Sequence, residues 1–195
     1  MATTRRQESE NLEIVRAFVN TRDVDEGTDA LSSPEVLRDW FASQGLMTDD
    51  APVQTADVSL ARDVREALRA LLLCNNEGCD PDREAVVALN DAATTAQVSV
   101  RFHEDGSPHL EPTVPGVPGA LGRLLAIVYG ARREGSWDRL KVCRNDTCRW
   151  AFFDESKNRS RHWCSMAVCG SQSKARTYRR RQSQRLRGGA VEPGA

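Results

Sequence analysis

Residues 143–170 read CRNDTCRWAFFDESKNRSRHWCSMAVCG, and their four cysteines decide the fold of the C-terminal part of the chain. The cysteines form two pairs of equal spacing, C-x4-C-x15-C-x4-C. Two short loops brought together present four thiolates at tetrahedral positions, which is the ligand set of a structural zinc ion. We therefore predict one structural Zn²⁺ held by Cys143, Cys148, Cys164 and Cys169.

Two other interpretations of these cysteines are an iron–sulfur cluster, which also takes four thiolates, and four unrelated buried thiols. The equal spacing of the pairs argues against chance, and we favour zinc over the cluster. Cys74 and Cys79 have the same C-x4-C spacing but no partner pair, so we interpret them as buried or free thiols. His162 is interpreted as a polar or phosphate-facing side chain, because residues as close as His162 and Cys164 rarely both reach one ion.

Positive charge is concentrated around and after the cysteines. Residues 139–187 hold 14 Lys or Arg and 3 acids, whereas the remainder of the 195-residue chain holds 13 Lys or Arg and 25 acids. A helix from about Ser171 to Arg187 would bury little, and phosphate neutralisation supplies a reason for it to form. The alternative is a solvated, frayed tail. The basic side chains predicted to contact nucleic acid are Arg159, Arg161, Lys174, Arg176, Arg179, Arg180 and Arg181.

The N-terminal part of the chain has mostly helical periodicity. The strongest helix is expected from about Thr55 to Leu73, and others at 12–19, 33–45, 82–96 and 119–133. Alternating apolar residues around a Glu-Asp-Gly turn predict a β-hairpin near 98–114. We predict a mainly α domain with this hairpin (α+β) over 11–135, then a short linker. A small four-cysteine zinc module, treble-clef-like and ending in a basic helix, follows over 138–182. Loss of the metal is expected to unfold this module and leave the body helical.

The two ends and the location of the protein are predicted from composition. Residues 1–10 and the basic, Gly-containing tail 183–195 are expected to be disordered. No apolar run approaches the roughly 20 residues of a membrane span, and the N-terminus has no stretch of signal-peptide type. We therefore expect a cytoplasmic, nucleoid-associated protein without membrane contact, whose cysteines are reduced or metal-bound.

The run from Cys143 to Gly170 resembles the CGNR zinc finger, with both cysteine pairs, the Phe-Phe-Asp, the Asn-Arg and the Trp-Cys-Ser-Met in the same order. Upstream, residues 18–23, 33–40, 68–72 and 88–90 resemble the ABATE domain that usually precedes this finger. The resemblance covers about residues 12–182. It implies zinc ligation by the four cysteines, a DNA-binding finger and a role in stress-induced transcription regulation.

The chain departs from the family at the tetrapeptide that names the finger. Cys-Gly-Asn-Arg is here Cys169-Gly170-Ser171-Gln172. Gln172 lacks the charge of Arg, but a Gln side chain forms two hydrogen bonds with an adenine edge. We therefore count Gln172 among the nucleic-acid-binding candidates, with Lys174 and the following arginines supplying charge for the phosphates.

These patterns predict a zinc-dependent DNA-binding transcription regulator, with RNA as an alternative ligand. A second hypothesis is a zinc-stapled protein–protein interaction or redox-sensing module, whose basic face docks on an acidic protein surface such as its own N-terminal half. A homodimer is compatible with either hypothesis. An enzyme is not expected, because four cysteine ligands leave no open coordination position for water and the sequence shows no other catalytic motif.

Overall fold

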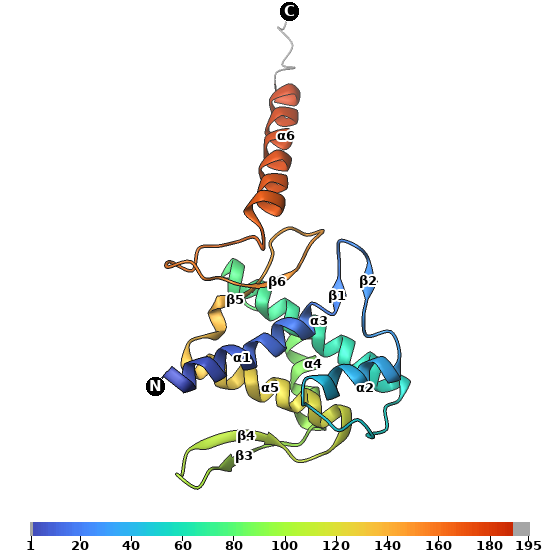
Figure 1. The fold of residues 1–195 in the computed structure, drawn as a ribbon. Coiled ribbons are helices and arrows are strands. Elements are labelled where there is room, and N and C mark those ends of the chain that lie inside the picture. Colours follow the sequence, from blue (N-terminus) through green and yellow to red (C-terminus); the bar gives the residue numbers. More distant parts are fainter. Residues whose placement is uncertain (1, 189–195) are drawn as a thin grey trace, which may run out of the picture.

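The structure is a computed structural model that describes residues 2–188, with the backbone alone at residues 2–10, 177, 180, 181 and 183–188. Six α-helices and three antiparallel strand pairs form this part of the chain (Figure 1). None of the described helices is both long and apolar enough to cross a bilayer. The helices are α1 (Ala2–Val19), α2 (Pro34–Ser43), α3 (Thr55–Glu77), α4 (Arg83–Thr95), α5 (Gly116–Glu134) and α6 (Ser171–Gly188). The strands are β1 (Arg22–Asp23), β2 (Thr28–Asp29), β3 (Val98–Phe102), β4 (Pro108–Pro112), β5 (Leu140–Val142) and β6 (Ala151–Phe153).

Helices α1, α3 and α5 contact one another around the core of the N-terminal body. The predicted apolar stripe of α3 is confirmed, and it is buried against side chains of the other two helices. Burial of a Leu, Val or Phe side chain stabilises a fold by about 1.5–3 kcal/mol relative to its exposed state. The fully buried residues of this core include Val15, Phe18, Leu68, Leu72, Leu121 and Leu124.

Helix α2 has the start and the end that the sequence predicts. The Ser33 hydroxyl accepts the backbone N–H of Val36 at 3.4 Å, and Pro34 takes the first helical position. At the other end Gly45 has a φ of 68°, a left-handed conformation that glycine adopts without steric cost.

Helix α3 continues through Glu77, beyond its predicted end at Leu73. It ends at Gly78, whose N–H donates to the carbonyl of Cys74 at 2.7 Å and whose φ is 70°. Asn75 and Asn76 therefore belong to the helix, although Asn favours caps and turns over helix interiors. Their side-chain amides donate to backbone carbonyls far along the chain instead of competing for the backbone of their own helix.

The predicted β-hairpin is confirmed. Strands β3 and β4 pair antiparallel, with Val98 opposite Pro112 and Phe102 opposite Pro108. The base of the hairpin packs on α5 because Gly122 has no side chain. A Cβ at Gly122 would lie 2.7 Å from the Cβ of Pro112 and 2.8 Å from the Cβ of Ala96. Neither neighbour has a flexible side chain, so the contact cannot relax without moving the backbone.

Replacing Gly122 by Ala should therefore lower the free energy of unfolding by about 1–3 kcal/mol. The intrinsic helix preference of Ala over Gly, about 1 kcal/mol, acts in the opposite direction. Gly130 of the same helix is the matched control, because a Cβ there meets only the flexible Glu134 carboxylate at 4.0 Å. Gly130→Ala should be neutral or stabilising in the same urea titration, and equal effects of the two changes would contradict the packing argument.

Both ends of the described chain are helical. Residues 2–10, for which the sequence predicted disorder, belong to α1. The sequence has neither Pro nor Gly between Ala2 and Val19, so nothing interrupts the helix that the apolar residues of 12–19 anchor. Helix α6 likewise continues to Gly188, past the predicted start of a disordered tail at 183. Residues 189–195 of that tail lie outside the described residues.

The cysteine-containing module and the N-terminal body share one core, whereas the sequence predicted two units joined by a short linker. Trp137 is 1% exposed, and Leu140, Val142 and Ala151 are fully buried. These four side chains belong to the same apolar cluster as the core of α1, α3 and α5. Strand β5 lies on α3, and β6 contacts α1. The module therefore packs directly against the body instead of being connected to it only by a linker.

Candidate metal centre

The first cysteine pair lies between strands β5 and β6. Val142 pairs with Ala151, and the N–H of Cys143 donates to the carbonyl of Trp150 at 2.9 Å. The chain reverses between these residues in a tight turn, in which the Asn145 carbonyl accepts the N–H of Cys148 at 2.9 Å and that of Arg149 at 3.0 Å. This turn directs the sulfurs of Cys143 and Cys148 to the same side.

The second pair lies just before α6. Ser165 accepts the N–H of Val168 with its side chain at 3.3 Å and that of Gly170 with its carbonyl at 3.0 Å. These bonds close a single wide helical turn, Met166–Gly170, that places Cys169 two residues before Ser171, the first residue of α6. The unpaired N–H groups at a helix start favour negative charge, as in a thiolate.

The four sulfurs come together as the sequence predicts. All four Sγ atoms lie within 4.8 Å of one another, with 3.6 Å between Cys148 and Cys164 and 3.7 Å between Cys164 and Cys169. A tetrahedral Zn²⁺ with Zn–S distances of about 2.3 Å requires S···S distances of about 3.8 Å. Cys143 and Cys169 are buried, and Cys148 and Cys164 are half-buried. The donor set and its spacing therefore fit zinc.

The pKa values of Cys143, Cys148 and Cys164 indicate why a cation suits this cluster. A hydrogen bond from the Cys148 thiol, with others from the backbone of Cys164 and Asn145, lowers the pKa of Cys143 to about 5. The same hydrogen bond and burial raise the pKa of Cys148 well above its ordinary value, and burial with the Cys143 charge raises that of Cys164 to about 12. Of these three thiols only Cys143 is stabilised as a thiolate by its neighbours, and a divalent cation would stabilise negative charge on the others.

Comparison with protein families gives two matches. Residues 139–182 match the CGNR zinc finger. Residues 13–131, more than half of the chain, match ABATE, described as a putative stress-induced transcription regulator. The chain belongs to the ABATE family. No curated protein matches the chain. The resemblance inferred from the sequence is thus confirmed for both parts of the chain, and the cysteine cluster is the metal site of the CGNR finger.

The other cysteines and His162 lie outside the metal site of the ABATE chain. Cys74 is half-buried and Cys79 exposed, and burial together with a hydrogen bond to Cys79 raises the pKa of Cys74 to about 12. His162 faces the body, where its Nδ1 lies 2.7 Å from Oδ1 of Asn76. Burial and the nearby Arg144 charge lower the pKa of His162, so its ring is held in the neutral form.

Asn76 of α3 joins the finger to the ABATE domain, a role for which no sequence pattern provides a signal. Its side-chain amide donates to the carbonyl of Val142 at 2.7 Å and to that of His162 at 2.9 Å. Its own carbonyl accepts from Arg144. One buried residue of the body therefore contacts both chain segments that precede Cys143 and Cys164 of the cysteine cluster.

Replacing Asn76 by Ala should lower the free energy of unfolding by about 1–3 kcal/mol, because buried carbonyls lose their donors. It should also speed the release of zinc to a colorimetric chelator, since the finger loses its attachment. Asn90→Ala on α4 is the control, because Asn90 is exposed and its side chain makes no hydrogen bond among the described residues. An Asn76→Ala protein with wild-type stability and zinc release would rule out this role.

A buried ion pair organises the loop between the two cysteine pairs. Lys141 and Asp154 are 3% and 0% exposed, and Nζ of Lys141 lies 2.7 Å from Oδ2 of Asp154. The same carboxylate accepts the backbone N–H groups of Ser156 at 3.0 Å and Arg161 at 2.9 Å. Burial opposes ionisation, but these donors hold the pKa of Asp154 well below its usual range. The loop between the two cysteine pairs is therefore held by this ion pair and its hydrogen bonds, since it has few apolar contacts of its own.

Two of the predicted phosphate-binding arginines have structural partners. The Arg161 guanidinium donates to the carbonyls of Trp163, at 2.9 Å, and Cys164, and it lies 5.0 Å above the Phe152 ring. Arg159 is exposed, and its Nη1 lies 3.2 Å from the Asp138 carboxylate. Arg161 therefore shapes the second cysteine loop, while Arg159 remains on the surface.

The other candidates lie on α6, where Asn145 connects the first turn to the metal site. The Asn145 amide lies 3.6 Å from the sulfur of Cys169 and donates to Oε1 of Gln172 at 3.0 Å, and its carbonyl accepts from Arg176. Gln172 and Arg176 are thus engaged with the first cysteine turn. Lys174 and Arg179 are exposed on α6. The side chains of Arg180 and Arg181 lie outside the described residues.

Proposed function

We propose that this ABATE-family chain is a zinc-dependent DNA-binding transcription regulator whose binding element is α6. The observation that supports this most strongly is the position of that helix. It begins at Ser171, two residues after the fourth cysteine, and runs away from the body (Figure 1). Its 18 residues contain seven Lys or Arg and no acid. A helix of this composition gains little from burial in a protein core and gains much from phosphates.

The dimensions of α6 suit the DNA major groove. At 1.5 Å per residue the helix is about 27 Å long, and the groove, about 12 Å wide, admits one α-helix. Exposed cations such as Lys174 and Arg179 would contact phosphates. Because Gln172 is already bonded to Asn145, we assign it to positioning the helix rather than to reading a base.

In this proposal one zinc ion has a structural role. Bound to Cys143, Cys148, Cys164 and Cys169, it would neutralise the thiolates and fix the first turn of α6 against the β5–β6 turn. A site of four thiolates has no open position for water, so we propose binding rather than catalysis as the function. The same charges act on any nucleic acid, and the choice of DNA over RNA rests on the family description.

Fluorescence anisotropy with labelled DNA and RNA duplexes of matched sequence tests the proposal. The zinc-loaded protein should bind DNA at low salt, and its affinity should fall by about 10³-fold or more between about 50 and about 200 mM salt if at least six phosphates are contacted. Stronger binding to RNA would replace DNA as the ligand. No binding to either duplex at low salt would refute the function.

Redox sensing at the same site is a second candidate function, favoured by the partial exposure of two ligands. Cys148 and Cys164 are half-buried and their sulfurs lie 3.6 Å apart. Hydrogen peroxide would take two electrons from this thiol pair, forming a disulfide and two molecules of water while zinc is released. If sensing is the function, stoichiometric peroxide should release zinc and a thiol reductant should restore its binding. Zinc retained under excess peroxide would exclude it.

A further inference from the structure

An open groove on the helical body has the opposite charge to α6. It lies between α3 and α4 and has a volume of about 630 Å³. Its length along α3, from Leu60 to Ala70, corresponds to about 15 Å, or three helical turns. Grooves of this kind between two helices receive amphipathic helices in many complexes.

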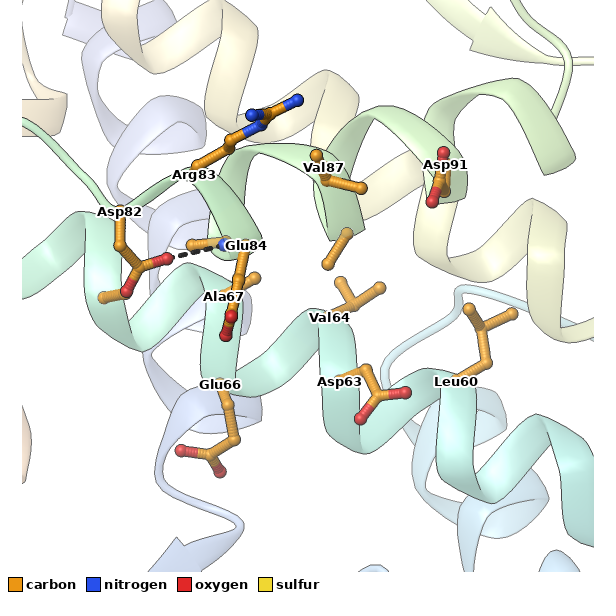
Figure 2. A pocket seen from close by; sticks show the side chains of 13 residues that line it. Leu60, Asp63, Val64, Glu66, Ala67, Asp82, Arg83, Glu84, Val87 and Asp91 are labelled. Carbon is orange, nitrogen blue, oxygen red and sulfur yellow. Dashed lines mark hydrogen bonds between the residues drawn. The ribbon is translucent and has the colours of Figure 1, made fainter.

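The groove has an apolar floor of small side chains. Figure 2 shows Leu60 and Val64 on the side of α3 that faces α4, and Val87 on α4; all three line the groove. Val87 is 46% exposed, which is high for a side chain of this type in a groove. Much of the remaining floor is alanine, so another helix would approach closely. These alanines are Ala67, Ala70, Ala85 and Ala88.

The rim of the groove carries carboxylates that have no ion-pair partner among the described residues. Asp63, Glu84 and Asp91 are exposed, and among residues 2–188 their carboxylates have no hydrogen bond or ion pair. The two other acids of the rim are engaged, because Asp82 accepts the N–H of Ala85 at 2.7 Å and Glu66 pairs with Arg69 at 3.0 Å. The groove therefore calls for a cationic, partly apolar occupant.

Helix α6 has the chemistry that this rim requires. Ala175 and Tyr178 lie three residues apart on one face, and Tyr178 is 67% exposed. Exposed cations, Lys174 and Arg179, lie beside that face. Because α6 runs away from its own body, the groove that it could enter belongs to another molecule (Figure 1).

We propose that α6 of one copy docks in the α3–α4 groove of a second copy. Two copies that exchange these helices form a closed dimer with two equal contacts. Each contact places the α6 cations against the carboxylates of Asp63, Glu84 and Asp91, and places Tyr178 on the floor formed by Leu60, Val64 and Val87. This self-association requires no nucleic acid, so its test is independent of the proposed DNA binding.

Sedimentation equilibrium of the zinc-loaded, full-length protein tests the exchange. The mass should rise above the monomer value of 21.6 kDa with concentration at about 0.01 M salt and return to it at about 1 M. Asp63→Lys with Asp91→Lys should raise the dimer dissociation constant about tenfold or more. Asp49→Lys with Asp50→Lys makes the same charge change on an exposed loop and should have no such effect. Circular dichroism establishes that each variant is folded.

A mixing experiment identifies the two surfaces. Lys174→Glu with Arg179→Glu leaves the groove intact and should also be monomeric. Mixed with the Asp63→Lys, Asp91→Lys protein, which keeps a wild-type α6, it should form a heterodimer, because one contact is wild type and the other sets the introduced glutamates against the introduced lysines. A wild-type protein that is monomeric at low salt, a groove variant that still associates, or a mixture that stays monomeric would each overturn the proposal.

Discussion

Removing zinc should unfold the ABATE domain together with the finger. The reason is the shared core, in which Trp137, Leu140, Val142 and Ala151 of the finger segment are buried with the side chains of α1, α3 and α5. Structural zinc stabilises finger peptides by about 10–16 kcal/mol, which equals or exceeds the 5–15 kcal/mol of a typical domain. Once the finger loses the ion, its strands no longer cover α3, and the body loses part of its core.

Circular dichroism during thermal unfolding measures this coupling. The zinc-loaded protein should unfold in one transition, and both a chelator and the Cys164→Ser substitution should lower the melting temperature of the whole helical signal. Cys79→Ser is the control, because Cys79 is exposed and lies outside the metal cluster. A body that keeps its helical signal and melting temperature after chelation would show that the two parts fold independently, as the sequence had predicted.

Neutralising four cations of α6 should nearly abolish DNA binding without affecting the metal site. We expect replacement of Lys174, Arg179, Arg180 and Arg181 by Gln to weaken binding by about 10³-fold at low salt. The slope of log affinity against log salt should fall by about 3.6, because each lost phosphate contact contributes about 0.9. Arg176 is kept, because its guanidinium contacts Asn145 beside the metal site.

The matched control removes four cations from the body, by replacing Arg83, Arg101, Arg132 and Arg133 with Gln. All four are exposed and lie outside α6. This variant has the same net charge as the α6 variant, so any large difference in DNA affinity comes from position. Equal losses in the two variants would assign binding to overall charge, and zinc content measured for both shows whether the finger is intact.

The parts of the structure that depend on local sequence were predictable. Helix α3 follows from a stripe of apolar residues, α2 from the Ser33-Pro34 start, and the β3–β4 hairpin from alternation around a turn. The clustering of the four cysteines was predictable for the same reason, since each pair lies within one short loop and the equal spacing of the pairs identifies them as one set. Periodicity and spacing are properties of neighbouring residues, and they are visible without a structure.

The features that join distant segments were not predictable from the same signals. Asn is common at helix ends, yet Asn76 lies within α3 and its side chain donates hydrogen bonds to the carbonyls of Val142 and His162. Trp137 follows a Gly-Ser pair typical of a linker, yet it is buried in the body. For the Lys141–Asp154 ion pair, the sequence contains one indication. Asp154 directly follows the two phenylalanines of a strand, where a carboxylate is expected to be buried and paired. Its partner, 13 residues earlier, follows from the pairing of β5 with β6.

Residue type also did not distinguish binding cations from structural ones. Arg161, Arg176 and Lys174 have similar sequence surroundings, and all were predicted to contact nucleic acid. In the structure Arg161 donates to backbone carbonyls of the second cysteine loop, and Arg176 donates to Asn145. Lys174 is exposed, and its side chain has no hydrogen bond or ion pair among the described residues. The difference arises because backbone carbonyls and amides near the metal site need donors and acceptors, and the nearest long polar side chains supply them.

X-ray absorption at the zinc edge, on the intact protein as purified, tests the central claim most directly. We expect one zinc per chain with four sulfur neighbours at about 2.3 Å, since a single ion would join the β5–β6 turn to the start of α6. A chain without metal, or a zinc with nitrogen or oxygen among its ligands, would contradict it.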